Sequence, residues 1–137
     1  MATTTFTNST GASSSSEHYY DVTISGITAS EVTNMRFELD WNPDEDCGGD
    51  ATSSECSIYS PASVSGWNNG DKSGGEARTD TFEKTSGFTG FSFNTSWTFY
   101  LYDDDYTECY TISEARIIVT HGAAAATTNA PFLMFVD

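Results

Sequence analysis

Apolar and polar residues alternate with a period of two along much of this chain, and this feature most constrains its fold. The alternation occurs in four runs, which are residues 20–24, 35–41, 97–101 and 115–119. Successive side chains of a strand point to opposite faces, so each run places its apolar residues on one face. This pattern is typical of antiparallel strands that pack on a core on one side. Shorter strand candidates are residues 57–60, 79–83 and 88–93.

Signals for helices are nearly absent. Ser and Thr make up 38 of the 137 residues, and both compete with helical hydrogen bonds. Dipeptides of a small polar residue followed by glycine, such as Asn69-Gly70 and Ser86-Gly87, fall between the runs and predict turns. Seven or eight short strands separated by turns predict an all-β, antiparallel β-sandwich.

Three segments lie outside this pattern. Residues 1–16 are rich in Thr and Ser and form either a flexible tail or an edge strand around Phe6. Residues 42–56 predict a long connecting loop, and loops of this length are often functional. Residues 122–130 form a small-residue linker before an apolar end. The expected organisation is an N-terminal segment (1–16), a β-sandwich (17–121), and a linker with an apolar C-terminal strand (122–137).

The charge balance excludes several partners. The chain has 20 acidic and 5 basic residues, a formal net charge of −15. Binding to nucleic-acid phosphates needs clustered Lys and Arg, so nucleic acid is excluded as a partner. No stretch has the ~20 apolar residues of a membrane span, and the first residues do not resemble a secretory signal. Aromatic residues make up 14% of the chain, enough for a core, so the charge does not indicate disorder.

Two acidic clusters are candidates for a metal site. Thirteen of the twenty acidic residues lie between positions 42 and 108, in or beside predicted loops. Calcium prefers several oxygen ligands from flexible loops, so it is the one candidate cofactor. The alternative is that these are solvated turn residues. The candidate ligands are Asp44, Asp46, Asp50, Asp103, Asp104 and Asp105.

No motif indicates catalysis, and we expect that the protein is not an enzyme. The G-x-S-x-G elbow, the H-E-x-x-H helix and phosphate-binding loops are absent from the sequence. The two histidines, His18 and His121, have no nucleophile at an informative spacing. Paired carboxylates leave glycoside hydrolysis open as a weaker alternative.

Cysteine and tryptophan residues give two further candidates. A disulfide between Cys47 and Cys56 would close a short loop and leave Cys109 as an unpaired third cysteine. The alternative is that all three cysteines are free thiols. Trp67 precedes Asn-Asn-Gly and is a candidate for stacking on a sugar, with packing under a loop as the alternative. Trp41 and Trp97 belong to alternating apolar sets, so we expect both in the core.

The C-terminal segment is strongly apolar. An exposed apolar stretch of strand length favours association with other chains. The segment therefore either closes the sandwich as a last strand or docks on a neighbouring subunit as an added strand. The predicted interface residues are Phe132, Leu133, Met134, Phe135 and Val136.

Several motifs occur in an order that resembles a known family. They are residues 20–27 (YDVTISGI), 34–39 (NMRFEL), 58–61 (IYSP), 79–82 (TDTF), 96–103 (SWTFYLYD) and 112–119. Together they resemble the strands of the proprotein-convertase P domain and of P-domain-like bacterial and phage proteins. The resemblance covers about residues 8–120 and implies a jelly-roll β-sandwich. The chain departs from the family pattern in the acidic insert at 42–56 and in Ser96, which stands where the family has glycine.

These features lead to an expectation about function. We expect a non-catalytic structural or surface protein of a larger assembly. Among such proteins, we favour a phage virion component (capsid decoration, fibre or tail-associated). It would work through contacts between subunits of a particle or filament, in a virion or outside the cell. The alternatives are an extracellular P-domain-like accessory module of a secreted hydrolase or adhesin, and a carbohydrate-binding module.

Overall fold

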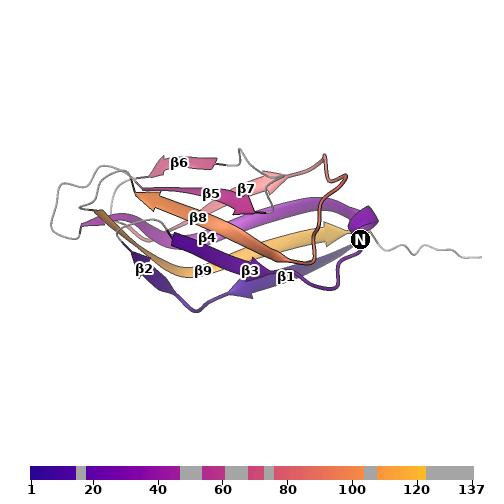
Figure 1. Cartoon of the computed structure of the whole chain (residues 1–137), viewed down its shortest axis with the longest axis horizontal. Helices are drawn as coiled ribbons and strands as arrows, with labels where there is room; N and C mark the ends of the chain where they lie inside the picture. The colour runs from indigo at the N-terminus through magenta and orange to yellow at the C-terminus, as the bar shows by residue number, and fades with distance from the viewer. Residues whose placement is uncertain (15–17, 47–53, 61–67, 73–75, 104–107, 123–137) are drawn as a thin grey trace, which may run out of the picture.

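The computed structural model describes residues 1–14, 18–46, 54–60, 68–72, 76–103 and 108–122. This part of the chain is built from strands that run along the long axis of an elongated sandwich (Figure 1). The elements are β1 (Ala2–Asn8), β2 (Ala12–Ser14), β3 (His18–Thr23), the 3-10 helix η1 (Ala29–Glu31), β4 (Val32–Asp46), β5 (Ser54–Ser60), β6 (Asn68–Lys72), β7 (Arg78–Lys84), β8 (Ser96–Asp103) and β9 (Glu108–His121). Among the described residues, no helix has the length and apolar character needed to cross a bilayer.

The strands form two antiparallel sheets. Sheet 1 has the order β1-β9-β4-β7, with β2 also paired to β9, and sheet 2 has the order β3-β8-β5-β6. When β1 and β2 are taken as one interrupted strand, the first strand pairs with the last, β3 with β8, β4 with β7 and β5 with β6. This nested pairing wrapped into two sheets is a jelly roll. The predicted fold class is confirmed.

The core lies between the two sheets and consists of the predicted apolar sets. Phe37 on sheet 1 faces Trp97 and Phe99 on sheet 2, with ring centroids 5.7 and 6.2 Å apart. The prediction that Trp41 and Trp97 are core residues is also confirmed. Other buried members are Tyr20, Val22, Ile24, Met35, Leu39, Leu101, Ala115, Ile117 and Val119.

The start of the chain belongs to the sandwich. β1 pairs with β9 without interruption from Ala2 opposite His121 to Asn8 opposite Ala115. The chain then turns at Gly11, whose φ of +73° favours glycine. The Tyr20 hydroxyl accepts a hydrogen bond from the Gly11 N–H and so fixes this turn. Of the two alternatives for this segment, the edge strand around Phe6 is the one observed.

The loop predicted at 42–56 is shorter than expected. β4 continues to Asp46 and stays paired with β9 as far as Glu108. A register shift between Asn42 and Glu45 lets the strand pass Pro43, because a bulge accommodates a residue that lacks an N–H. The turn predicted at Asn69-Gly70 was also wrong, since both residues lie in β6.

Residues 88–93 do not form the predicted strand. Gly87 and Gly90 have φ values of +73° and +85°, in the left-handed region. The Phe91 N–H donates to the Phe88 carbonyl across a tight turn, at 3.2 Å. The backbone therefore changes direction too often for a strand. The phenylalanines of this segment pack as a cluster at one end of the sandwich.

Candidate functional site

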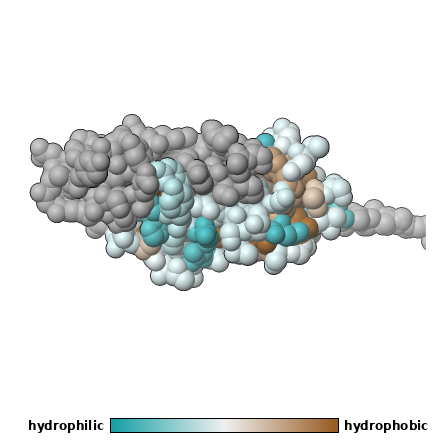
Figure 2. All heavy atoms as spheres, in the orientation of Figure 1, coloured by the Kyte–Doolittle hydropathy of each residue, from teal (hydrophilic) through white to brown (hydrophobic). Residues whose placement is uncertain are grey.

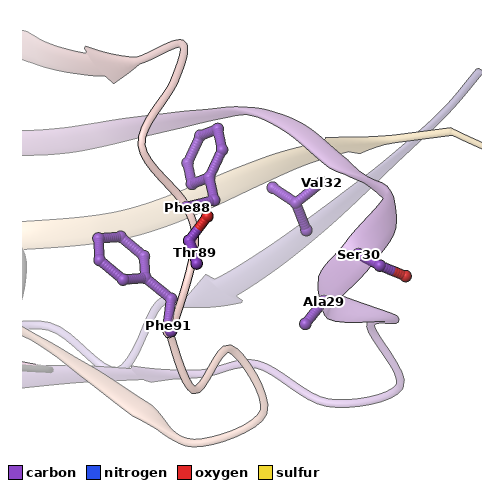
Figure 3. A pocket seen from close by; sticks show the side chains of 7 residues that line it. Ala29, Ser30, Val32, Phe88, Thr89 and Phe91 are labelled. Carbon is purple, nitrogen blue, oxygen red and sulfur yellow. The ribbon is translucent and has the colours of Figure 1, made fainter.

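A pocket of about 450 Å³ opens at the end of the sandwich where β9 finishes (Figure 3). Its volume is in the usual range for ligand pockets, about 300–1,000 Å³. One wall comes from η1 and the start of β4, and the other comes from the connection between β7 and β8. The lining residues are Ala29, Ser30, Val32, Phe88, Thr89, Gly90 and Phe91. We call this end of the molecule the pocket end.

Aromatic packing builds the β7–β8 wall. Phe93 is 2% exposed and stacks on Trp97 with ring centroids 6.1 Å apart. Phe88 and Phe91 pack on Phe93 at 6.0 and 5.9 Å. The Lys84 ammonium lies 5.5 and 5.2 Å from the ring centroids of Phe88 and Phe91, within the range of a cation–π contact. Both rings are therefore held in place while remaining only half-buried.

The opposite wall is tied to the first by one asparagine. Asn94 donates its side-chain N–H to the Ile27 carbonyl and accepts the Ile27 N–H, both at 2.8 Å. In η1, the Glu31 N–H donates to the Thr28 carbonyl at 3.0 Å. The two walls therefore form one unit, although they are about sixty residues apart in the sequence.

The lining of the pocket is uncharged and mixes apolar side chains with polar groups. None of its seven lining residues has a titratable side chain, and the polar side chains are the hydroxyls of Ser30 and Thr89. Figure 2 shows brown, hydrophobic atoms at the surface at this end of the molecule. The pocket can receive apolar side chains, and its lining offers no carboxylate, imidazole or thiol for acid–base chemistry.

The end of β9 lies beside this pocket. The Gly122 N–H donates to the Glu31 carbonyl at 2.7 Å, and Glu31 directly follows Ser30 of the pocket wall. The described chain therefore finishes next to the pocket. The residues that follow include the predicted interface at 132–136, which lies outside the described residues.

The outer face of sheet 1 carries a network of charges. Arg116 on β9 binds Glu38 at 2.9 Å and Asp40 at 2.7 Å on β4, and it also contacts Glu114. Arg36 binds Glu38 from the other side at 2.8 Å. Hydrogen bonds from Arg36 and Arg116 lower the pKa of Glu38, and that from Arg116 lowers the pKa of Asp40. These carboxylates raise the pKa of Arg116 in return.

This network predicts a loss of stability in acid. The folded pKa values of Glu38 and Asp40 lie below their ordinary values of 4.5 and 3.8. The two carboxylates therefore contribute fully to the free energy of unfolding above these ordinary values, and their contribution is lost as the pH falls through the folded pKa values. We expect Arg116→Met to lower the free energy of unfolding at pH 7 by about 2 kcal/mol. Urea unfolding from pH 7 to pH 2.5 should show this difference shrinking towards zero. A difference that stays constant with pH would contradict the prediction.

β4 and β8, which carry Asp46 and Asp103 of the acidic clusters predicted as a calcium site, both finish at the other end of the sandwich (Figure 1). Backbone pairing places Asp46 at the end of β4 opposite Glu108, and Asp103 at the end of β8 opposite Ser54. The backbone of Asp44 also lies in β4, whereas Asp50, Asp104 and Asp105 lie outside the described residues. Within the described part of the chain, no group of three or more His, Cys, Asp or Glu residues could hold a metal ion. Calcium binding remains a prediction.

The disulfide between Cys47 and Cys56 and the stacking role of Trp67 remain predictions. Cys47 and Trp67 lie outside the described residues, and the backbone of Cys56 lies in β5. The pocket itself was missed by the sequence analysis. Its signal was the phenylalanine-rich segment 88–93, where Gly87 and Gly90 disturb the spacing expected of a strand.

Comparison with known proteins provides no relative from which a function can be transferred. No family model matches the chain, and the searches of curated proteins and of solved structures gave no match. The resemblance to P-domain-like proteins therefore remains an expectation, and the function is argued from the geometry of the chain itself.

Proposed function

We propose that this protein is a non-catalytic building block of a larger assembly, in which the apolar segment 132–136 of one copy fills the pocket of a neighbouring copy. The observation that carries this proposal is the pocket beside Gly122, where the described chain finishes, with the rings of Phe88 and Phe91 in its lining. A component of a phage virion, such as a capsid decoration, fibre or tail-associated protein, is the form of assembly that we favour.

The segment and the pocket are chemically complementary. The segment offers two phenylalanines, a leucine, a methionine and a valine, and the pocket presents the half-buried rings of Phe88 and Phe91 beside Val32. Full burial of one such side chain contributes about 1.5–3 kcal/mol, and a ring-to-ring contact adds about 0.5–1.5 kcal/mol. Association costs about 4 kcal/mol or more in lost freedom of motion, so two anchored side chains give a contact that is weak singly and strengthens when it is repeated in an assembly.

The linker is long enough to reach a second molecule. Nine residues, 123–131, separate Gly122 from the segment, and an extended chain of that length spans about 30 Å. A contact from the tail of one copy to the pocket of the next is head-to-tail, so its repetition gives a ring or a filament. The chain's own pocket is also within this reach, and the experiment below separates the two cases.

Removal of residues 131–137 is expected to abolish extended assembly and leave a small folded species. The pocket variant Ala29→Glu/Thr89→Glu should have the same effect, because both positions are exposed and line the pocket. Ser92→Glu, which is exposed in the same connection but does not line the pocket, should assemble normally. Light scattering measures the mass, and circular dichroism checks folding.

Mixing the deletion variant with the pocket variant makes the test specific. The deletion variant keeps an intact pocket and the pocket variant keeps an intact tail, so mixing them should raise the mass above that of either alone. If the deletion unfolds the protein, the segment instead closes its own sandwich. If both variants assemble as the unchanged chain does, the proposal is wrong.

Carbohydrate binding is a second candidate, favoured by an aromatic pair on sheet 2. Tyr19 is 52% exposed and lies opposite Tyr100, with ring centroids 5.0 Å apart. Exposed tyrosine rings present an apolar body with a polar tip, which suits the faces of sugar rings. Pull-down with insoluble polysaccharides separates this candidate from assembly alone.

A further inference from the structure

We propose that β1 is a second interface, at which β1 of another copy pairs antiparallel and joins the two sandwiches into a symmetric dimer. Sheet 1 would then continue across the dimer. This inference shares with the proposed function only the premise that copies associate, because it uses a different surface and a contact of different symmetry.

The outer edge of β1 is regular, and its Asn8 end is tied to β3, because the Asn8 side-chain amide donates to the Asp21 carbonyl at 2.8 Å. β1 ends sheet 1 and pairs on one side with β9, with no register shift between Ala2 and Asn8. The outer edge of such a strand presents unpaired N–H and C=O groups, which form a template for another strand. Among the described residues, the one backbone group of β1 bonded from outside sheet 1 is the Asn8 carbonyl, which accepts the Tyr20 hydroxyl at 3.2 Å.

The other sheet edges carry charges that discourage pairing. On β7, Asp80 points inward and is 7% exposed, and Arg78 binds it from the same strand. β3 contains Asp21, and β6 contains Asp71 and Lys72. Inward-pointing and edge charges are common protections against edge-to-edge association. Of the four strands that end the two sheet paths, β1 is the one without a charged residue, and it also lacks proline. β2, which also pairs with β9, is uncharged as well but has three residues, and a short edge offers little for pairing.

The sequence of β1 is suited to pairing with itself. Thr3, Thr5 and Thr7 alternate on the exposed face of the strand. Antiparallel pairing about a twofold axis at Thr5 places Thr5 opposite its copy and Thr3 opposite Thr7. Directly opposed threonines form favourable cross-strand pairs. The interface would therefore be isologous, with the same three threonines contributed by each copy.

The charge distribution of the molecule favours the same edge. Copies with a net charge of −15 repel one another, so contact is least opposed where acidic groups are few. Beside β1, exposed Asp21 of β3 lies at the Asn8 end of the strand, away from its middle at Thr5. The β9 residues beside Thr3, Thr5 and Thr7 are Thr120, Ile118 and Arg116. The carboxylates nearest Thr7 are those that Arg116 binds, so their charge is partly neutralised. The acidic strand ends at Asp46 and Glu108 lie beyond the far end of β1, because Asn8 pairs with Ala115.

A charge-swap experiment tests this dimer. It uses the full chain carrying Ala29→Glu/Thr89→Glu, so that docking of the tail is removed and the β1 contact is measured alone. Sedimentation of this protein should give a species of twice the 14.8 kDa chain mass. Adding Thr3→Lys/Thr5→Lys or Thr3→Glu/Thr5→Glu should weaken dimerisation roughly tenfold or more, because like charges then face one another. An equimolar mixture of the two charged variants should restore the dimer.

The controls give each outcome a meaning. Thr81→Lys on β7, also an exposed outward threonine, should leave the dimer intact. A monomer at all concentrations up to about 1 mM in the starting protein, or charged variants that dimerise unchanged when alone, would overturn the proposal. Failure of the mixture to reassociate, with both variants folded, would overturn it as well. A dimer that persists although the tail and pocket variants have no effect on assembly would sink the proposed function and leave this inference standing.

Discussion

Phe93→Ala is expected to lower the free energy of unfolding by about 4 kcal/mol, near the middle of the range for removal of a buried phenylalanine. Phe93 is 2% exposed and its ring contacts Trp97, Phe88 and Phe91. Its truncation leaves a cavity directly beneath the aromatic wall of the pocket. Urea unfolding followed by tryptophan fluorescence and circular dichroism measures the loss.

The matched control is Phe93→Leu, which keeps most of the apolar volume and should cost less than about 2 kcal/mol. Both variants retain the backbone carbonyl that accepts the Trp97 Nε1–H at 2.9 Å, so the difference between them reports ring packing. A loss below about 1 kcal/mol for Phe93→Ala would show that the 85–95 connection does not depend on this ring. The pocket wall would then need another explanation.

Asp80→Ala is expected to cost about 3 kcal/mol. The carboxylate accepts the Trp41 Nε1–H at 2.8 Å and binds the Arg78 guanidinium at 2.9 Å, while being 7% exposed. Its removal leaves the indole N–H buried without this partner, a cost of about 1–3 kcal/mol, and also removes charge-assisted bonds. Thermal and urea unfolding measure the effect.

A double-mutant cycle with Trp41→Phe separates these contributions. If the indole–carboxylate bond is the main cause, the double variant should be destabilised by at least about 1 kcal/mol less than the sum of the single variants. Arg78→Ala serves as the control, because Arg78 is exposed and its loss should cost less than about 1 kcal/mol. Strict additivity of Asp80→Ala and Trp41→Phe would contradict this assignment.

The sequence predicts the core of this fold well because the core depends on strand periodicity. The run 35–41 places Met35, Phe37, Leu39 and Trp41 on one face, and all four are buried. The periodicity fails at residues 88–93, where left-handed glycines turn the backbone. It also failed to find Asp80, although Asp80 stands two residues before buried Phe82 and so shares its face. Carboxylates are seldom buried, and this one is explained by its two partners, the Trp41 indole N–H and the Arg78 guanidinium.

The pocket was harder to predict than the core. Its walls come from residues 29–32 and 88–91. Nothing in the sequence of either segment indicates that the two lie side by side. The two segments are connected by hydrogen bonds between the Asn94 side chain and the backbone of Ile27. Any asparagine can pair in this way with the backbone at an exposed strand end, so the sequence does not indicate which one does. Long-range contacts of this kind require the three-dimensional arrangement. The apolar segment 132–136, in contrast, is evident from the sequence because it is continuous.

The nested pairing of the jelly roll has a consequence for how the protein is made. β9 occupies the inside of sheet 1, between β1 and β4, yet it follows every other described strand in the chain. A nascent chain on the ribosome therefore cannot complete sheet 1 until β9 has emerged, and contacts such as Ala2 with His121 give the fold a high contact order. Folds of this kind close in milliseconds to seconds. Until then, the apolar faces of β4 and β8 lack their cover, and exposed apolar surface of this kind favours aggregation.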